Sequence, residues 1–464
     1  MTTVAAPRVR PVPEPRTGRP RRGGGLRRNA VVALFMAPAA VLLGAIVVYP
    51  TIATVARSLY DDSGNFIGAG NYRTLFGTAD ILVAIRNNAI WVIVFPFLVA
   101  FLGLVFAVLT ERIRWSTAFK TIVFMPMAIS LFATGVIWRV VYETDPSRGV
   151  LNAAIGTVAD TIHQPGMYAL PNIKPSSGLT AAGDGGMVSK NAVDAGGALQ
   201  LGLTGISPSA VPPSAQVAQA PSSVAGAVTG LVWRDFSPGG HIGVVDPGEK
   251  GLPGMRLNLL ATDGHTAATT ASGNNGAFRF DGVSGGSYHV VLDAANFRPP
   301  FGGVNWLGVQ SLTPVSGLGT TGQALLAIPL ADLSAIVAML WVWSGFAMVI
   351  IGAGLAALNR EVLEAARMDG ASELQTFRYV TFPLLRPVLI VVFITMIINV
   401  LKIFDIILSL VPDSSQQQAN VIALEMWRVA FTGLRGKGLG SAIAVFLFLL
   451  VIPVIALNVR RIRE

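Results

Sequence analysis

Long apolar runs dominate the pattern of hydrophobic and polar positions along this chain. Six of them come close to or exceed the ~20 residues that an α-helix needs to cross the hydrocarbon core of a bilayer. The runs cover residues 30–56, 87–110, 121–138, 333–359, 387–412 and 438–459. Five are uncharged, and the run 387–412 contains only Lys402 and Asp405. We therefore expect six transmembrane helices, the third of which extends to Val141.

Composition also indicates a membrane protein. The 464 residues are 52% hydrophobic and 13% charged, whereas roughly 25% of the residues of a soluble domain are charged. The chain has no cysteine, which excludes thiol catalysis and cysteine-based zinc sites. A domain outside the cytoplasm would be held by its core or by a metal rather than by disulfides.

The distribution of basic residues predicts the orientation. Eight arginines and one acid, Glu14, precede the first run, and the net charge of the chain is +9. Basic residues also follow the second run, at 112–120, and the last run, at 460–463. Because such residues collect on the cytoplasmic side, we expect both termini to be cytoplasmic and residues 143–331 to lie outside. Nucleic-acid binding by the tail at 1–29 is disfavoured, since no aromatic residues alternate with its arginines.

Residues 143–331, between the third and fourth runs, contain two kinds of sequence. Residues 226–293 contain short alternating runs separated by Gly and Asn turns, which is typical of a small antiparallel β-sandwich. Within the flanking stretch 143–225, residues 170–224 are rich in Pro, Gly, Ser and Ala and poor in aromatic residues, and a second loose stretch lies within 294–331. We expect both stretches to be extracytoplasmic linkers.

A polar, helix-forming insert at 359–383 separates the fourth run from the fifth. Asn359 is placed to cap a helix, and Gly370 is placed to end it in the left-handed conformation. Ser372 and Gln375 have the spacing of a capping box that opens a second helix. A charged amphipathic hairpin at a bilayer surface suits the docking of a soluble partner. An ordinary amphipathic helix lying on lipid is the alternative.

Within this insert, Glu364-Ala365-Ala366 is followed by Asp369-Gly370-Ala371 and, further on, by Pro383, where we expect the second helix to stop or bend. This spacing resembles the EAA loop of ABC importer permeases, the loop through which the membrane subunit binds the ATPase. The residues implied in ATPase coupling are Glu364, Ala365, Ala366, Asp369, Gly370, Ala371 and Pro383. The chain has no Gly-x-x-x-x-Gly-Lys-[Ser/Thr] loop of its own. We therefore expect no cofactor bound by this chain, with ATP and Mg on the partner ATPase.

Segments on both sides of the insert are similar to the maltose-type sugar permeases. These segments are 125–130, 145–152, 341–345, 353–355 and 440–442. The resemblance implies a fold of six core helices, a second homologous permease subunit, an ABC ATPase dimer and an extracytoplasmic solute-binding lipoprotein. The loop 411–420 and the end of the last run look closest to the α-glucoside branch. That implies an α-glucoside or another oligosaccharide as the sugar substrate.

Polar residues inside the fifth run are candidates for the substrate pathway. They are Asn399, Lys402 and Asp405, and the last two, three residues apart, are expected to share a helix face and to pair. Ionisable groups at such depth usually face a bundle interior or a cavity. A structural ion pair, or a pair near the outer interface, is the alternative. Three further candidates, for which an aromatic belt at the outer interface is the alternative, are Trp341, Trp343 and Ser344.

The segments 230–235, 246–254 and 276–280 together resemble the B-type repeat domains of Gram-positive surface proteins. In those repeats an acidic loop after the first strand can bind calcium. The resemblance implies Asp235, Asp246 and Glu249 as calcium ligands, with Ser237 as a fourth. Calcium takes 6–8 oxygen ligands, so a solvated turn without an ion is the alternative.

Taken together, these patterns predict an all-α polytopic membrane protein with six transmembrane helices and an inserted small all-β sandwich domain. We expect a non-catalytic permease subunit of an ATP-driven sugar importer in the bacterial cell membrane. A membrane-anchored cell-surface sensor or adhesion protein, acting through the β-domain, is the alternative. Such a protein would need neither the insert at 359–383 nor six spans.

Overall fold

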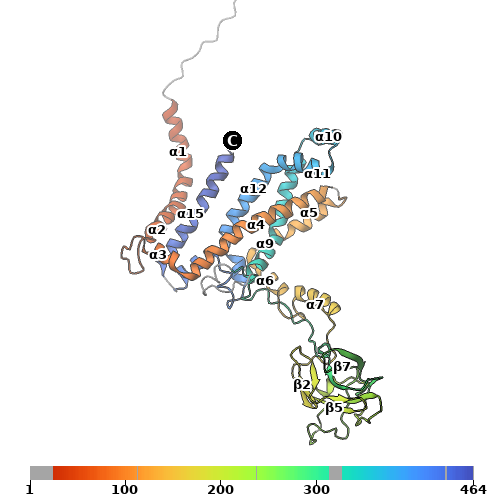
Figure 1. The fold of residues 1–464 in the computed structure, drawn as a ribbon. Helices are drawn as coiled ribbons and strands as arrows, with labels where there is room; N and C mark the ends of the chain where they lie inside the picture. Colours follow the sequence, from red (N-terminus) through yellow and green to blue (C-terminus); the bar gives the residue numbers. More distant parts are fainter. Residues whose placement is uncertain (1–23, 112, 237, 313–326, 434–435, 463–464) are drawn as a thin grey trace, which may run out of the picture. The chain divides into compact units, whose positions relative to one another are not determined.

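The structure is a computed structural model that describes residues 24–111, 113–236, 238–312, 327–433 and 436–462 (Figure 1). The chain forms two compact units. The first comprises the described residues up to Phe101, together with Gly354–Phe404 and the residues from Asn420 onward. The second comprises Leu102–Ala353 and Asp405–Ala419. The tail predicted at 1–29 lies largely outside the described residues, as does the part of the second predicted linker at 313–326.

The first unit is helical. Its last helix, α15, packs against α2, α3, α12 and α14, and its core includes Leu75, Ile81 and Ile443. The elements of this unit are α1 (Gly24–Leu43), the π-helical turn η1 (Gly44–Val48), α2 (Tyr49–Arg57), α3 (Gly70–Gly77), the first part of α4 (Ala79–Glu111), α10 (Arg360–Met368), α11 (Glu373–Thr376), the π-helical turn η5 (Phe377–Thr381), α12 (Phe382–Leu401), α14 (Ile422–Phe431) and α15 (Lys437–Ile462).

The helices of the second unit are mostly short. They are the end of α4, α5 (Ser116–Phe124), the 3-10 turn η2 (Met125–Ala128), α6 (Leu131–Val141), α7 (Val150–Ile162), most of α9 (Leu330–Ala356) and α13 (Asp405–Leu410). Helices α6 and α13 pack closely. A Cβ atom at Gly135 would lie 1.9 Å from the Ser409 hydroxyl oxygen, so this approach requires glycine on α6.

Five helices of the described residues are long and apolar enough to cross a membrane. The span predicted at 121–138 differs, because α5 and α6 are bent by 104° relative to each other. Pro126 in η2 lacks the N–H that would continue the helical hydrogen bonding. Ser130 is extended, and its side chain caps α6 by accepting a hydrogen bond from the Ala133 N–H at 3.2 Å. The predicted fold class is confirmed, with up to six spans if the bent pair counts as one.

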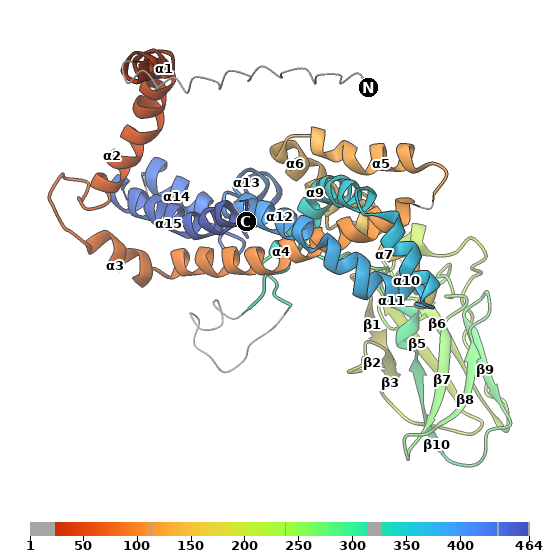
Figure 2. The same cartoon turned by 90° about the horizontal axis from the view of Figure 1, so that it is seen from above.

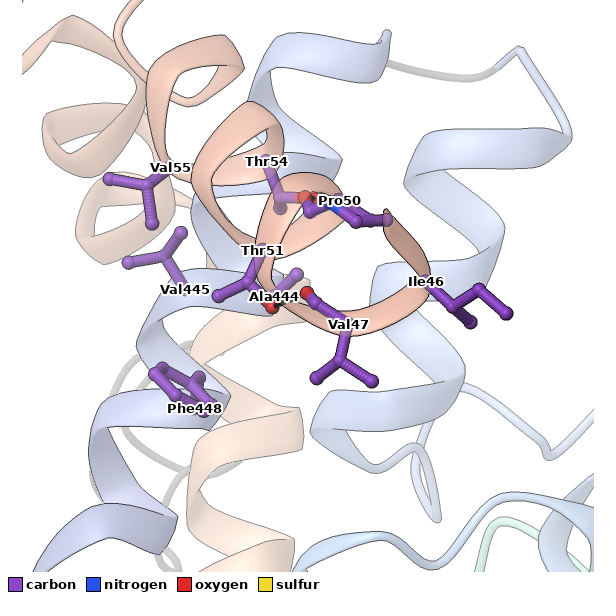
Figure 3. A pocket seen from close by; sticks show the side chains of 9 residues that line it. All are labelled: Ile46, Val47, Pro50, Thr51, Thr54, Val55, Ala444, Val445 and Phe448. Carbon is purple, nitrogen blue, oxygen red and sulfur yellow. Dashed lines mark hydrogen bonds between the residues drawn. The ribbon is translucent and has the colours of Figure 1, made fainter. Parts of the chain in front are cut away.

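A hollow of about 330 Å³ lies between α2, η1 and α15 in the first unit (Figure 3). Its lining is mostly aliphatic and aromatic and includes Val445 and Phe448. The hydroxyls of Thr51 and Thr54 also line it, but each donates to a carbonyl one turn earlier in its own helix. With its hydroxyls used inside the helix, this surface suits lipid or another apolar helix rather than a sugar.

Two consecutive asparagines of α4 bind the extended residue that precedes α14. The Asn87 amide nitrogen donates to the Asn420 carbonyl at 2.7 Å, and the Asn88 amide oxygen accepts from the Ile422 N–H at 2.6 Å. The residue between them, Val421, is in the β conformation, so these two backbone groups point to the same side. The side chains of Asn87 and Asn88 therefore bond this backbone as a neighbouring β-strand would. We call this arrangement the amide latch.

The second unit also carries a β-sandwich of two sheets (Figure 2). One sheet has the order β1-β5-β6-β9, and the other has the order β2-β3-β10-β7-β8 with β4 beside β10. Leu201, Val232, Leu257 and Val290 are fully buried between them. The strands are β1 (Lys174–Ser177), β2 (Leu179–Ala181), β3 (Met187–Ser189), β4 (Val193–Asp194), β5 (Ala198–Thr204), β6 (Ala227–Arg234), β7 (Arg256–Ala261), β8 (Thr266–Ala271), β9 (Ala277–Asp281) and β10 (Ser287–Leu292).

The linker predicted at 143–225 is wrong for most of its length. It contains α7 and the five strands β1–β5, and Leu179, Leu201 and Leu203 are buried in the sandwich core. The prediction failed because these strands are short and are interspersed with Gly and Ser. The composition therefore looks like that of a linker, although the few apolar residues face a core.

The β-domain also differs from the prediction in its pairing and its ends. Strands β5 and β6 pair in parallel, which is possible because residues 205–226 provide the long crossover that parallel strands need. The Gly166 N–H donates to the Arg298 carbonyl at 2.9 Å, and the Tyr168 N–H donates to the Asn296 carbonyl at 3.1 Å. The two ends of the domain therefore lie side by side, and the domain extends over 166–298 rather than 226–293.

A single buried asparagine joins the segments that enter and leave the β-domain. The Asn152 amide nitrogen donates to the carbonyls of Glu143 and Val304 at 2.8 and 3.0 Å. Its oxygen accepts from the Val304 N–H at 2.9 Å and from the Trp306 indole N–H at 3.1 Å. The start of α7 and the returning chain are thus held by one side chain.

Two carboxylates are buried at one end of β6. Asp235 accepts a hydrogen bond from the Gly243 N–H at 2.7 Å, and Glu249, 3% exposed, accepts one from the Asp246 N–H at 3.0 Å. Desolvation raises the pKa of the Glu249 carboxyl. The hydrogen bond from Asp246 opposes this shift, while the negative charges of Asp235 and Asp246 add to it. The folded domain therefore binds a proton at Glu249 more readily than the unfolded chain does.

We expect Asn88→Leu to destabilise the first unit by roughly 1–3 kcal/mol, the cost of leaving the buried Ile422 N–H without an acceptor. The measurement is the thermal unfolding temperature of the purified protein in detergent. Asn399→Leu is the matched control, because the Asn399 side chain bonds only a carbonyl of its own helix, that of Thr395, at 2.9 Å. An equal decrease of the unfolding temperature in the two variants would contradict a stabilising role of the amide latch.

We expect Glu249→Gln to stabilise the β-domain at neutral pH. Since the pKa of Glu249 is raised on folding, the wild-type domain loses stability as pH rises from the unfolded pKa through the folded one. Glutamine does not titrate, so the variant should lack this part of the pH dependence. Hydrogen exchange of the β6 amides in the full chain between pH 4 and 8 measures it, with the exposed Asp281→Asn as control. An unchanged pH profile in Glu249→Gln would contradict the assignment.

Candidate functional site

The insert at 359–383 forms a compact helical hairpin in the first unit. Figure 1 shows α10 and α11 as a short helical pair beside the end of α12. Both helices are short, with 9 and 4 residues, and isolated helices of that length are marginal in water. Their ends therefore decide whether the hairpin has a fixed shape.

Helix α10 is capped at both ends, as predicted. At its start, the Asn359 side chain accepts from the Glu361 N–H at 2.9 Å. At its end, the Ala371 N–H bonds the Ala366 carbonyl at 3.1 Å and the Gly370 N–H bonds the Arg367 carbonyl at 3.0 Å. This pair of bonds is the Schellman motif. Gly370 has a φ of +83°, the left-handed conformation that glycine adopts without steric cost.

Helix α11 opens with the predicted capping box. The Ser372 hydroxyl accepts from the Gln375 N–H at 3.3 Å, and the Gln375 side chain accepts from the Ser372 N–H at 2.7 Å. Across the turn, the Arg367 guanidinium lies 3.2 Å from the Glu373 carboxylate. Both side chains are about half exposed, so this pair orients the two helices more than it stabilises them.

The hairpin turns a large apolar surface outward. Leu363 and Ala366 are half-buried against the protein, as their helical spacing predicts. Met368, Leu374 and Tyr379 are 88%, 75% and 70% exposed. Exposed large apolar side chains rimmed by polar residues are typical of a protein interaction surface. The predicted coupling residues Glu364, Ala365, Asp369, Gly370 and Pro383 are exposed as well, and Ala366 and Ala371 are half-buried.

Sequence patterns did not identify Met368, Leu374 or Tyr379. Met368 and Leu374 lie outside the stripe formed by Leu363 and Ala366, and that departure from the apolar periodicity is the signal that could have found them. The Arg367–Glu373 pair had no such signal, because its spacing across a glycine turn is not a helical one.

Of the two outcomes expected at Pro383, a stop or a bend, the stop does not occur. The chain is continuously helical from Glu373 to Leu401. The π-helical turn η5 lies directly before Pro383, which occupies the first turn of α12. A proline inside a continuous helix removes one backbone hydrogen bond, and a π-helical turn beside it is one way in which a helix accommodates such an interruption. The hairpin is thus joined to a membrane-spanning helix without a break.

The predicted pairing of Lys402 and Asp405 on one helix face is wrong. Helix α12 ends at Leu401, and the Lys402 N–H bonds the Asn399 carbonyl at its C-terminus. Asp405 begins the separate helix α13. Lys402 and Asp405 are both exposed, and Asn399 is half-buried. Asp405 belongs to the second unit and the other two residues to the first.

The other pathway candidates lie on α9 in the second unit. Trp341, 37% exposed, contacts Trp138 of α6 edge-on with ring centres 6.0 Å apart. Trp343 contacts Phe346 at 5.6 Å, and Ser344 is buried. These contacts are compatible with a pathway wall and with an interfacial belt.

The residues predicted to bind calcium do not form a ligand group. Among the residues that the structure describes, no three His, Cys, Asp or Glu side chains come together as metal ligands do. Asp235, Asp246 and Glu249 instead accept backbone N–H groups of the loop that they belong to. These bonds help to order the loop. Ser237 lies outside the described residues.

Comparisons with known protein families match two parts of the chain. Residues 304–462 match the family described as binding-protein-dependent transport system inner membrane component. Residues 226–299 match the SdrD B-like domain, which confirms the resemblance of the inserted β-domain.

Known relatives extend over most of the chain. The osmoprotective compounds uptake permease protein GgtC of Synechocystis sp. is 28% identical over 92% of this chain and 97% of its own. The alpha-glucoside transport system permease protein AglF of Rhizobium meliloti is 25% identical over 92% of this chain and 81% of its own. The trehalose/maltose transport system permease protein MalF of Thermococcus litoralis is 36% identical over 35% of this chain and 54% of its own.

A solved structure shares the fold. It is that of a bacterial ABC transporter involved in the import of the acidic polysaccharide alginate, with a TM-score of 0.51 and 14% identity. The match covers 95% of this chain and 99% of that one. These relatives are transport subunits rather than enzymes, and they favour the transporter over the sensor or adhesion protein. The family match over 304–462 and these relatives support an ABC importer permease for sugars or oligosaccharides.

Proposed function

We propose that this permease docks an ABC ATPase through the hairpin at 359–383. We also propose that it carries a neutral oligosaccharide, with an α-glucoside as the first candidate. The single observation behind the docking is the capped hairpin itself. Its shape is set by the Schellman turn at Gly370 and the capping box at Ser372. Its apolar residues Met368 and Leu374 face outward, where a partner groove would cover them.

The hairpin is built to transmit movement to the membrane. The helical stretch Glu373–Leu401 has 29 residues, which corresponds to a length on the order of 40 Å at 1.5 Å per residue. A shift of the hairpin by the ATPase therefore moves one end of a continuous rod. The other end carries Asn399, half-buried near the C-terminus of α12. If this end lines the substrate pathway, its movement would open the pathway to one side of the membrane and close it to the other.

The proposed assembly contains four kinds of subunit. The ATPase dimer binds ATP and Mg, a second homologous permease completes the pathway, and an extracytoplasmic lipoprotein delivers the sugar. The excess of arginine before residue 30 supports cytoplasmic termini, which places the hairpin in the cytoplasm and the β-domain outside. The names of AglF and of the trehalose/maltose permease support a glucoside as the substrate.

Purification of the tagged chain from native membranes in mild detergent tests this assembly. We expect an ABC ATPase, a second permease and a lipoprotein to come with it, and the ligand of the lipoprotein to identify the sugar. Recovery of the chain alone, or with cell-wall proteins only, would contradict the proposal.

We expect Gly370→Val to abolish ATP-dependent uptake while the chain still inserts into the membrane. A β-branched residue at a φ of +83° costs roughly 1–2 kcal/mol, which is enough to open the Schellman turn of so short a helix. Gly370→Asn should retain more uptake, because asparagine tolerates the left-handed conformation. Beyond the two neighbouring residues, no atom lies within 4 Å of a Cβ atom at this position, so the added Cβ itself meets no clash.

The matched control for this prediction is Gly77→Val. A Cβ atom there also meets nothing within 4 Å, and the residue does not have a positive φ. Uptake in proteoliposomes and ATPase binding are the measurements. Equal effects of valine at the two positions, or full uptake in Gly370→Val, would remove the basis for this docking site.

A further inference from the structure

The β-domain contains a hollow that no function considered above uses. Its volume is about 560 Å³, within the range of roughly 300–1,000 Å³ that is common for ligand sites. One side is the irregular segment 219–224, and the other is the end of β8 with the turn that follows it. Strands β6 and β9 form the floor. The hollow is separate from the carboxylate loop at Asp235 and Glu249.

Both sides of the hollow are held in place by hydrogen bonds. On one side, the buried Thr229 hydroxyl donates to the Ser222 carbonyl at 2.8 Å, and the Ala227 N–H donates to the Val224 carbonyl at 3.2 Å. On the other side, the Asn275 side chain accepts from the Ala277 N–H at 3.1 Å. The hollow is therefore part of the folded domain rather than a gap between loose loops.

The floor is closed by an aromatic ring. A Cβ atom at Gly230 would lie 2.2 Å from the Phe278 ring, so glycine at this position leaves room for the ring. Phe278 is only 4% exposed. The ring therefore fills the bottom, and both polar and apolar side chains line the hollow above it.

The uncharged polar side chains of the lining have one kind of chemistry. They are amides and hydroxyls, which both donate and accept hydrogen bonds. The single charged residue of the lining, Arg279, bonds the Asp281 carboxylate at 2.5 Å, so its charge is compensated. Apart from Thr229, whose hydroxyl bonds the Ser222 carbonyl, the polar lining residues are Gln219, Ser222, Thr270 and Asn275. Such a lining suits an uncharged ligand with many hydroxyl groups.

A peptide added as an extra strand fits this place less well. Strand β9 ends its sheet, but both backbone groups of its first residue are occupied. The Ala277 N–H bonds the Asn275 side chain, and the Ala277 carbonyl accepts from the Gly273 N–H. The rest of the edge carries the charged pair Arg279 and Asp281, and charged side chains protect sheet edges from strand addition.

We propose that this hollow binds a neutral oligosaccharide. Two sources share that chemistry, namely the solute that the permease carries and a glycan of the cell envelope. In the first case the β-domain would raise the concentration of solute at the transporter, and in the second it would hold the transporter against the envelope. The proposal does not depend on the ATPase docking at the hairpin.

Calorimetric titration of the full chain in nanodiscs tests the proposal. The probes are maltohexaose, a neutral N-acetylglucosamine tetrasaccharide and an unstructured peptide mixture. We expect one saccharide to bind and the double variant Gln219→Ala/Asn275→Ala to weaken its binding at least tenfold. Thr270→Arg, which fills the hollow, should abolish binding. Thr269→Ala is the control, since this exposed residue of β8 is not part of the lining.

Each outcome decides the question. Maltohexaose binding that responds to the variants supports the transported solute as the source, and tetrasaccharide binding supports an envelope glycan. Absence of saccharide binding, binding that the variants leave unchanged, or peptide binding that Thr270→Arg blocks would each overturn the proposal. Hydrogen exchange of β6 shows whether the variants fold. Uptake by proteoliposomes that contain the assembled transporter with the same variants reports the transport function separately.

Discussion

The structure depends on one constraint, that a polypeptide backbone in apolar surroundings must satisfy its hydrogen bonds inside the protein. Most of the chain meets it with long helices. Where the helical bonding is interrupted, a side chain takes over. Ser130 caps α6 after the bend that follows α5, and Asn87 and Asn88 pair with the backbone on both sides of the extended Val421. The breaks are therefore fixed features of the fold.

The hairpin must satisfy its backbone hydrogen bonds as well, and there water competes for the same donors and acceptors. Helices of 9 and 4 residues gain little from their own hydrogen bonds. Their ends are satisfied by Asn359, by the Schellman turn at Gly370 and by the capping box at Ser372. Because local bonds hold the shape, the hairpin does not need to bury Met368 and Leu374 in its own core. Its apolar side chains remain available to a partner.

The β-domain illustrates how an insertion is tolerated. Its two ends meet through the backbone bonds of Gly166 with Arg298 and of Tyr168 with Asn296, and the buried Asn152 joins the segments beyond them. A domain that enters and leaves at one point does not disturb the helices around it. The match to the SdrD B-like domain covers 226–299, yet strands from 174–204 complete both sheets.

Features that rest on local bonding could be predicted from the amino-acid sequence. The apolar runs predicted the long helices, and the capping pattern predicted where α10 and α11 begin and where Gly370 turns the chain, because these bonds join residues a few positions apart. Only the tertiary structure decided the rest. The strands at 174–204, the parallel pairing of β5 with β6, the latch at Asn87 and Asn88 and the burial of Glu249 all depend on partners distant in the sequence. The separation of Lys402 from Asp405 belongs with them, because a break in a helix inside an apolar run has no signal in the hydrophobic pattern.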